Sequence, residues 1–258
     1  MDSLDPEARS IFAEGRQLYV GVVTKNGPHV TPELYATVGD DLWFATAAST
    51  LKAKAVRRDG RMAAMVRIGS RAAVVTGQAE KYDVADPVAL LGNARDAMKA
   101  LQAVGAFTLR NAADLGGFAR DLVAGRLPSR TPPRRVLVRL RPEASAVIDA
   151  GGLPGDRDAV LGWSHDGQPL VLPARCDDAM DRAWIAATLP DGFDVGTDSA
   201  PACLAVDAYL APGPAAKTGL LRRGTATPRR EQDVVRLELA AERDTTWDGA
   251  ETRTVPAP

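Results

Sequence analysis

The sequence predicts a mainly β protein with a helical insert, an α+β fold built from two β-barrels in tandem. Short, locally connected strands fill the first part of the chain. Their apolar residues often fall in unbroken runs, which favours a closed barrel over an open two-faced sheet. The apolar period becomes helical over residues 86–125. The second half echoes the motifs of the first, so we expect one barrel in residues 1–150, which contains the insert, and a degenerate barrel in residues 151–258.

Length, charge and cysteine usage exclude several classes of protein. The chain has 258 residues, a net charge of −1 and 45% hydrophobic residues, as ordinary soluble proteins do. Because it has no surplus of basic residues, nucleic acid is not an expected partner. No apolar run approaches ~18 residues, so no membrane span is expected. Cys176 and Cys203 lie in separate apolar segments and are expected to be buried in a reducing compartment, which suggests a cytoplasmic protein.

The first barrel is expected to begin with a short helix over residues 6–16, for which Asp5 is the N-cap. Asn26 and Gly27 form a tight turn, since glycine tolerates positive φ. This turn and the next one would join three consecutive antiparallel strands into a meander. The strands of the first half are expected at residues 18–24, 29–38, 42–47, 61–68, 71–83 and 135–148.

The insert carries apolar residues at helical spacing. Val88, Leu91, Met98 and Leu101 are expected to form the apolar face of one helix, and residues 109–123 a second helix. We expect the insert to bound the substrate side of any cofactor cleft and so to set specificity.

Residues 42–58 join a strand to a short basic helix. Ser49 and Thr50 offer an N-cap, and no Gly or Pro interrupts residues 51–58. Lysines in the first turn oppose the helix dipole at ~0.3–1 kcal/mol each, a cost that a bound phosphate would offset. This element therefore predicts a phosphate site, and a solvated basic helix face is the alternative. The candidate ligands are Thr46, Ser49, Thr50, Lys52, Lys54 and Arg57.

The second half repeats short motifs of the first half in the same order. The matches pair Gly167 with Gly27, Trp184 with Trp43, Ala202 with Met62, Gly224 with Gly77 and Leu237 with Leu140. Residues 189–196 replace the basic helix, and they contain Pro and Gly but no Lys or Arg. No phosphate site is therefore expected in the second half.

Residues 29–80, HVTPELYATVGDDLWFATAASTLKAKAVRRDGRMAAMVRIGSRAAVVTGQAE, resemble the split β-barrel flavin-binding superfamily of pyridoxamine 5′-phosphate oxidase. They are also similar to its actinobacterial members that use deazaflavin F420. In this superfamily a Ser-Arg-Lys run binds the cofactor phosphate. Here Thr50-Leu51-Lys52 stands at that place, and Lys54 is a substitute for the missing arginine charge.

The resemblance also implies where the cofactor ring lies. The strand with Thr31 and Pro32 corresponds to the one that runs along the isoalloxazine ring. The Arg-Gln pair of the oxidase stands here as Arg71-Ala72, and the lost glutamine argues against pyridoxamine phosphate oxidation. The family usually dimerises around the cofactor. A tandem chain would supply both walls, which implies a single-chain pseudo-dimer that is monomeric or a weak homodimer.

Two functions follow from the resemblance. The first is an FMN- or F420-dependent oxidoreductase that transfers hydride between the cofactor and a small organic substrate. The cofactor carries such chemistry, so no catalytic side chain is assigned. The second is a non-catalytic flavin- or haem-binding protein of the same fold. His29 directly follows a turn and is expected to be an exposed turn histidine, and neither a catalytic triad nor a metal site is expected.

Overall fold

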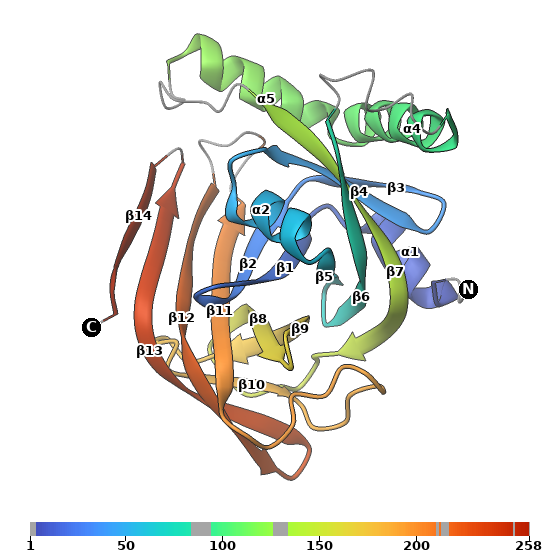
Figure 1. The fold of residues 1–258 in the computed structure, drawn as a ribbon. Helices are drawn as coiled ribbons and strands as arrows, with labels where there is room; N and C mark the ends of the chain where they lie inside the picture. Colours follow the sequence, from blue (N-terminus) through green and yellow to red (C-terminus); the bar gives the residue numbers. More distant parts are fainter. Residues whose placement is uncertain are drawn as a thin grey trace.

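A computed structural model describes residues 4–83, 94–125, 134–209, 212, 217–249 and 251–257. The protein is mainly β, with two seven-stranded antiparallel sheets and a pair of helices inserted in the first half (Figure 1). The predicted α+β class with an α insert is therefore confirmed. Among the described residues, no helix has the length and apolar character needed to cross a membrane.

The strands of the first half are β1 (Leu18–Thr24), β2 (Gly27–Glu33), β3 (Tyr35–Val38), β4 (Asp41–Ala47), β5 (Arg61–Ile68), β6 (Arg71–Tyr82) and β7 (Arg135–Asp149). Its helices are α1 (Pro6–Glu14), α2 (Leu51–Arg58), α4 (Ala94–Arg110) and α5 (Ala112–Val123). The strands of the second half are β8 (Arg157–His165), β9 (Gln168–Cys176), β10 (Arg182–Ala186), β11 (Ala200–Tyr209), β12 (Lys217–Glu231), β13 (Val234–Asp248) and β14 (Glu251–Pro256).

Both halves arrange their strands as a barrel in the same order. In the second half β10 pairs with β9 on one side and with β13 on the other, which closes the ring β10-β9-β8-β11-β12-β13. In the first half the order is β2-β1-β5-β6-β7-β4-β3, and only Leu34 separates β2 from β3. The bent strand β2–β3 thus takes the place of β9, and β4 takes the place of β10. The two split barrels in tandem agree with the prediction.

The predicted meander of the first three strands is wrong. The strand expected at residues 29–38 breaks at Leu34, so that β2 lies beside β1 at one edge of the sheet and β3 lies beside β4 at the other. The next neighbour of β4 is β7, where Trp43 is opposite Arg139. A local turn pattern shows that strands follow one another. It does not show that one strand bends and changes its neighbour.

A glycine at a β-bulge occupies the same place in both barrels. The β6–β7 register shifts just before Gly77, and the β12–β13 register shifts just before Gly224. A Cβ atom on Gly77 would lie 2.0 Å from the carbonyl oxygen of Arg141, and one on Gly224 would lie 1.9 Å from that of Ala240. Only glycine fits such a close approach of two backbones. The predicted match of Gly224 with Gly77 is therefore confirmed.

Three of the predicted matches are displaced. Gly167 takes the place of Asn26 rather than Gly27, and two others are displaced by two residues. With the bulge glycines aligned, Leu239 rather than Leu237 takes the place of Leu140. β10 pairs with β13 and shares its displacement of two residues, so Trp184 does not take the place of Trp43. A displacement of two residues leaves every side chain on the same face of its strand. For this reason the apolar pattern alone could not detect it.

The two barrels pack across an approximate two-fold axis. Gly21 in β1 and Gly162 in β8 hold equivalent places, as do Val30 and Val171. A Cβ on Gly21 would lie 2.3 Å from Cγ2 of Val171, and a Cβ on Gly162 would lie 2.5 Å from Cγ2 of Val30. Reciprocal contacts between equivalent residues are the property of a two-fold interface. The chain is thus a single-chain pseudo-dimer, as predicted.

Alternate residues of a strand serve two different cores. In β5, Met62, Ala64 and Val66 fill the first barrel, whereas Ala63 and Met65 belong to a core that extends into the second barrel. Both faces of such a strand are therefore buried. This explains the unbroken apolar runs from which the closed barrel was predicted.

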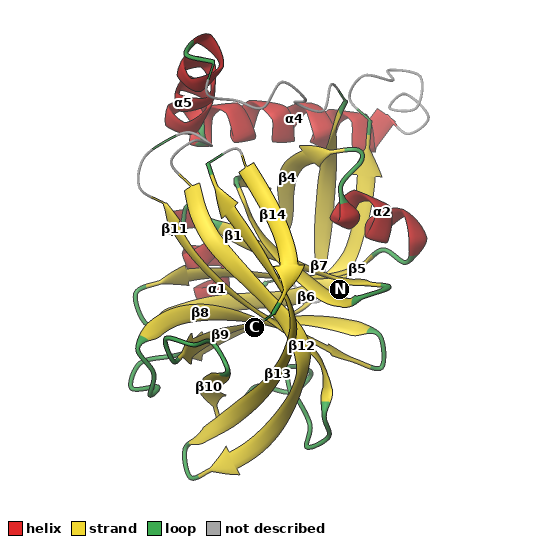
Figure 2. Ribbon diagram, turned by 90° about the vertical axis from the view of Figure 1, so that its left-hand side faces the viewer, coloured by secondary structure: helices red, strands yellow, loops and turns green. Residues whose placement is uncertain are grey.

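The helical insert lies over the strand ends of the first barrel (Figure 2). Its predicted apolar face is wrong, because the side chains of Met98 and Leu101 are 58% and 65% exposed while Ala100 and Ala103 are buried. The insert thus packs through small residues. Leu109 belongs to the first helix rather than the second. Val88 and Leu91 lie outside the described residues.

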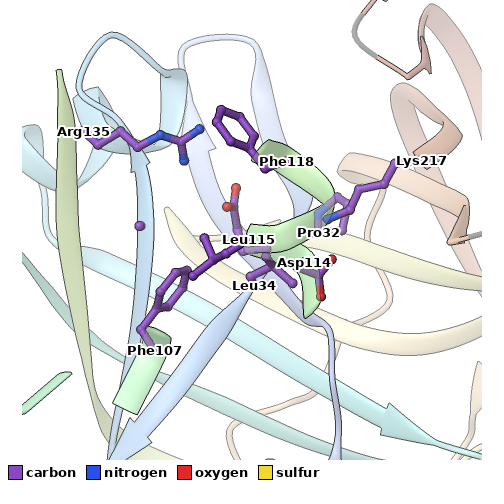
Figure 3. A pocket seen from close by; sticks show the side chains of 10 residues that line it. Pro32, Leu34, Phe107, Asp114, Leu115, Phe118, Arg135 and Lys217 are labelled. Atoms are coloured by element: carbon purple, nitrogen blue, oxygen red, sulfur yellow. The ribbon is translucent and has the colours of Figure 1, made fainter. Parts of the chain in front are cut away.

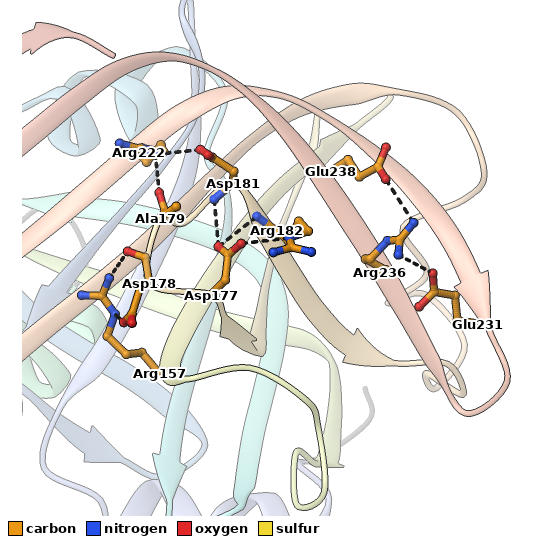
Figure 4. A network of polar contacts seen from close by, with 10 residues as sticks. All are labelled: Arg157, Asp177, Asp178, Ala179, Asp181, Arg182, Arg222, Glu231, Arg236 and Glu238. Carbon is orange, nitrogen blue, oxygen red and sulfur yellow. Dashed lines mark hydrogen bonds and ion pairs between the residues drawn. The ribbon is translucent and has the colours of Figure 1, made fainter. Parts of the chain in front are cut away.

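The barrels differ in how they close one end. In the first barrel, Ile11 and Phe12 of α1 are buried in the core. In the second barrel, the Arg222 guanidinium pairs with Asp244 and Asp181, each at 2.8 Å (Asp181 is drawn in Figure 4). Arg222 occupies the place that Val75 holds in the first barrel. A buried ion pair therefore stands where the first barrel uses apolar contacts with a helix.

Candidate functional site

The strand–helix element of the first barrel forms as predicted. Thr50 is the N-cap of α2: its Oγ1 accepts a hydrogen bond from the Ala53 amide at 3.3 Å and donates to the Ala47 carbonyl at 2.9 Å. Thr46 Oγ1 lies 3.3 Å from the same hydroxyl. Two hydroxyl groups therefore meet at the start of a helix, where the free N–H groups and the dipole favour an anion.

Lys52 points inward rather than into water. Its residue is 7% exposed, its Nζ forms an ion pair with the Glu33 carboxylate, and it donates a hydrogen bond to Thr31 Oγ1 at 2.8 Å. Burial lowers the pKa of Lys52 to about 7, and the charge of Arg135 adds to the shift. Lys52 thus already has a counter-ion on β2.

The remaining predicted ligands divide into two groups. Ser49, Lys54 and Arg57 are exposed on the outer side of the loop and helix. Pro32 is half-buried and lines a pocket, which places it with Thr31 and Lys52. The structure therefore brings together the residues of β2 and the first turn of α2, and it leaves Lys54 and Arg57 in solvent.

A pocket of about 280 Å³ lies between β2, β4 and the helical insert (Figure 3). Its volume is close to the lower end, ~300 Å³, of small-molecule sites, so it suits a ring system better than a whole nucleotide. Its walls are mainly apolar and carry two aromatic rings. The strand side is formed by Pro32, Glu33 and Leu34, and the insert side by Phe107, Leu115 and Phe118.

The insert is fixed over this pocket by the residues that join its two helices. The Arg110 guanidinium lies 4.6 Å from the centre of the Tyr35 ring and donates to the Ala13 carbonyl at 2.8 Å. Asn111 donates from Nδ2 to the Tyr35 carbonyl at 3.1 Å. These contacts tie the insert to β3 and to the end of α1, so the insert wall of the pocket has a defined position.

Two cations that the sequence analysis did not select line the same pocket. Arg135 starts β7 directly beside Ala47, and its guanidinium lies 5.8 Å from the centre of the Phe118 ring. Lys217 comes from β12, so the second barrel contributes to the site. In Figure 3 they lie on opposite sides of Phe118. In the sequence Arg135 follows a stretch rich in Pro and Arg, residues 127–134. Only the pairing of β4 with β7 shows that it lies beside Ala47.

The prediction that His29 is an exposed turn histidine is wrong. His29 is half-buried in β2, and its Nδ1 lies 2.6 Å from Nη2 of Arg223 in the second barrel. Because arginine can only donate, Nδ1 is the acceptor and the ring proton is on Nε2. Burial, and then the charges of Arg223 and Lys52, lower the pKa of His29 to about 3. His29 is therefore neutral at physiological pH and joins the two barrels.

The equivalent region of the second barrel is built differently. Pro173 takes the place of Pro32. The residues between β10 and β11 form a loop, as predicted, in which Phe193 and Val195 are buried. Because this loop has neither a capped helix nor a basic residue, the second barrel has no counterpart to the α2 site.

The arrangement suits the binding of a flat molecule between apolar walls, which carry two cations, Arg135 and Lys217, and two carboxylates, Glu33 and Asp114. The residues that line the pocket, all of them described, include no serine, cysteine or histidine. Elsewhere, both cysteines are buried and free, as predicted, and burial raises the pKa of each to about 11. The pocket thus offers apolar surface with charged side chains of both signs around it. The hydroxyl groups at the helix start lie outside its lining.

No protein-family model and no curated protein matches the chain. Solved structures do resemble part of it. A conserved hypothetical protein from Mycobacterium tuberculosis is 22% identical over 60% of this chain and 93% of its own, with a TM-score of 0.40. A FAD-binding protein from Mesorhizobium loti is 18% identical over 57% of this chain and 95% of its own, with a TM-score of 0.40.

A pyridoxamine 5′-phosphate oxidase-related, FMN-binding protein from Nostoc punctiforme is 17% identical over 67% of this chain and 98% of its own, with a TM-score of 0.39. The matched structures thus include proteins named after the superfamily that the sequence resembles. The likeness is too distant to assign an activity to this chain.

Proposed function

We propose that the pocket binds the ring of FMN or F420 and that the cofactor phosphate lies at the start of α2. The observation that carries this proposal is the way β2 links the two places. Thr31 is hydrogen-bonded to Lys52 of α2, whereas Pro32 and Glu33 of the same strand line the apolar pocket. One strand therefore spans the distance between an anion-binding helix start and a ring-sized apolar space.

The phosphate has hydroxyl and cationic ligands within this element. Thr46 and Thr50 present hydroxyls at the helix start, and exposed Ser49 completes the loop. Arg135, beside Ala47, supplies a positive charge for which no carboxylate partner occurs among the described residues. Lys54 and Arg57 lie on the outer face and add long-range attraction that salt screens.

Lys52 takes part together with Glu33. The pair has no net charge, so it attracts a phosphate less than a free lysine would. Glu33 also lines the pocket, and Lys52 holds its carboxylate beside Thr31. We therefore assign Lys52 two tasks: it offers N–H donors to the phosphate, and it fixes Glu33 at the edge of the ring space.

With such a cofactor bound, the protein is an oxidoreductase that transfers hydride between the ring and a small organic substrate. The cofactor supplies the redox chemistry, and the chain's residues bind it, orient it and exclude water. The insert, through Phe107 and Phe118, bounds the side from which the substrate would approach. A non-catalytic flavin-binding protein is the alternative. The lining residues give no support to haem, since they offer no histidine, cysteine or methionine as an axial ligand.

Titration of the full chain with FMN and with F420, followed by absorbance and tryptophan fluorescence, tests the proposal. We expect one of the two to bind. Arg135→Gln should weaken binding about tenfold or more, because a charge-assisted hydrogen bond contributes ~1.5–3 kcal/mol. The matched control is Arg229→Gln, an exposed arginine of the second barrel that pairs with Glu238 at 3.2 Å.

Failure of both cofactors to bind would overturn the proposal. Equal affinity of the Arg135→Gln variant and the wild type would show that the phosphate lies elsewhere. A panel of small organic substrates separates the two functions. Reduction of the bound cofactor by one of them indicates the enzyme, and no reduction by any of them indicates the non-catalytic alternative.

A further inference from the structure

A second and larger pocket lies where the two barrels meet. It has a volume of about 410 Å³, within the range of small-molecule sites, and it shares no lining residue with the pocket below the insert. We call it the dyad pocket. Its polar lining comes from both barrels: Arg16, Gln17, Tyr19, Arg67, Asp158 and Asp207.

The polar contacts of this pocket are equivalent pairs across the two-fold axis. Gln17, just before β1, is equivalent to Asp158 in β8. Arg67 in β5 is equivalent to Asp207 in β11. Gln17 donates to Asp207, and Arg67 donates to Asp158 at 3.0 Å. The contact between these two positions is thus made once on each side of the axis. One of the positions holds Asp207 in the second barrel and Arg67 in the first. An identical pair of subunits could not place opposite charges at equivalent positions.

The Asp207 side of the dyad pocket presents a fixed carboxylate. Tyr19 Oη donates to Asp207 Oδ1 at 2.8 Å, and Gln17 donates to the other oxygen. Both donors are neutral, because burial and the Asp207 charge raise the pKa of Tyr19 above its ordinary value. A carboxylate has about four acceptor sites, so Asp207 keeps acceptor capacity for a further donor. This side therefore favours a cationic group such as an ammonium.

The Arg67 side presents a guanidinium with a donor to spare. Nε donates to the Gly69 carbonyl at 2.8 Å and Nη2 to Asp158, whereas the buried Nη1 has no partner among the described atoms. A buried donor without a partner is unfavourable, and a ligand oxygen placed beside it would satisfy it. Arg16 adds a second cation at the rim. This side favours a carboxylate.

Small apolar residues lie between the two charged sides. Ala159, Val160 and Ala205 line the pocket there, and the alanines are buried. They leave room for a short aliphatic link and offer it no polar partner. We propose that the dyad pocket binds a small zwitterion, a molecule that carries an ammonium and a carboxylate joined by a short carbon chain, such as an α- or ω-amino acid.

Binding of defined probes to the full chain tests this proposal. Glycine, β-alanine and 4-aminobutyrate are the zwitterions, and propionate and propylamine carry the same groups singly. We expect at least one zwitterion to shift the amide resonances of Ala159 and Ala205 in NMR spectra and to bind about tenfold or more tightly than either single-charge probe. A single-charge probe that binds as well as every zwitterion would overturn the proposal, as would the absence of any zwitterion binding.

Three variants locate the site. Asp207→Asn retains the shape of the side chain and should weaken zwitterion binding about tenfold or more, as should Arg67→Gln. Ala205→Leu, on the same face of β11 as Asp207, fills the space without changing a charge and should abolish binding. Arg229→Gln, far along β12, should bind like the wild type. Unchanged affinity in folded Asp207→Asn and Ala205→Leu variants would overturn the proposal, whether or not the chain binds FMN or F420.

Discussion

The two barrels of this protein share a strand order, a bulge glycine and a reciprocal interface, yet only the first carries helices among the described residues. α1 closes one end of the first barrel, α2 offers an anion site, and α4 and α5 cover a pocket. The second barrel has a buried ion pair at Arg222 and an apolar loop instead. The comparison teaches that one fold can be kept by its strands while function depends on what connects them.

The largest expected effect concerns the buried pair of the first barrel. Lys52→Met would leave the Glu33 carboxylate, 15% exposed, without its cation and should cost ~3–5 kcal/mol of unfolding free energy. The double variant Lys52→Met with Glu33→Gln should recover most of this loss. Denaturant unfolding measures both. A single variant as stable as the wild type would show that Glu33 is protonated or solvated rather than paired.

The matching test in the second barrel removes Arg222. Arg222→Met should also cost ~3–5 kcal/mol, because Asp244 would remain buried without a cation. Adding Asp244→Leu should restore stability, since an apolar pair of similar volume often replaces a buried ion pair. If Arg222→Met lowered the free energy of unfolding by less than ~1 kcal/mol, the ion pair would not stabilise the second barrel as α1 is expected to stabilise the first.

The interface between the barrels can be tested by symmetric substitutions. Gly21→Val and Gly162→Val each push a side chain into a valine of the other barrel and should each cost ~1–3 kcal/mol. Gly105→Ala in α4, where nothing lies within 4 Å, is the control and should be stabilising by up to ~1 kcal/mol. Very unequal costs for the two valine variants would show that the interface is less symmetric than its geometry indicates.

His29 of the first barrel should produce a pH effect that its counterpart in the second barrel does not. The pKa of His29 is lowered from 6.5 to about 3, so between these values the unfolded chain binds a proton that the folded chain does not. Stability therefore falls as the pH drops through this window. His29→Gln should remove up to ~1.36 kcal/mol per pH unit of that fall. In the second barrel the buried Leu170 takes the place of His29. Parallel stability curves for variant and wild type would contradict the buried neutral histidine.

The smallest expected effect concerns the cap of α2. Thr50→Ala should cost ~1 kcal/mol, because the helix start loses its side-chain acceptor. Ser49→Ala is the matched control, since its exposed side chain makes no hydrogen bond among the described residues, and it should change stability by less than ~0.5 kcal/mol. Equal losses of stability in the two variants would show that Thr50 is not the N-cap of α2.

The sequence was sufficient to predict the features that local chemistry determines. The Thr50 cap, the strand after it and the loop that replaces α2 in the second half follow from residue types close together in the chain. Gly224 was matched to Gly77 from its place in the order of the repeated motifs, and the structure shows that glycine alone fits the bulge there. These predictions did not need the positions of distant residues.

Features that depend on distant partners could not be predicted. The counter-ion of Lys52 is Glu33 and that of Arg222 is Asp244, and each pair forms only when the barrel closes. His29 was expected in solvent because its partner, Arg223, belongs to the other barrel. The exposed face of α4 was predicted to be buried, since the helical period shows where a stripe lies and not which side packs.

The central claim is that one barrel holds a phosphorylated redox cofactor and the other does not. Calorimetric titration of the full chain with FMN and with F420 tests it most directly, because the stoichiometry reports the number of sites. The account predicts one molecule of one cofactor per chain, with binding reduced by Arg135→Gln. Two molecules per chain would contradict the difference between the barrels, and no binding of either cofactor would contradict the site itself.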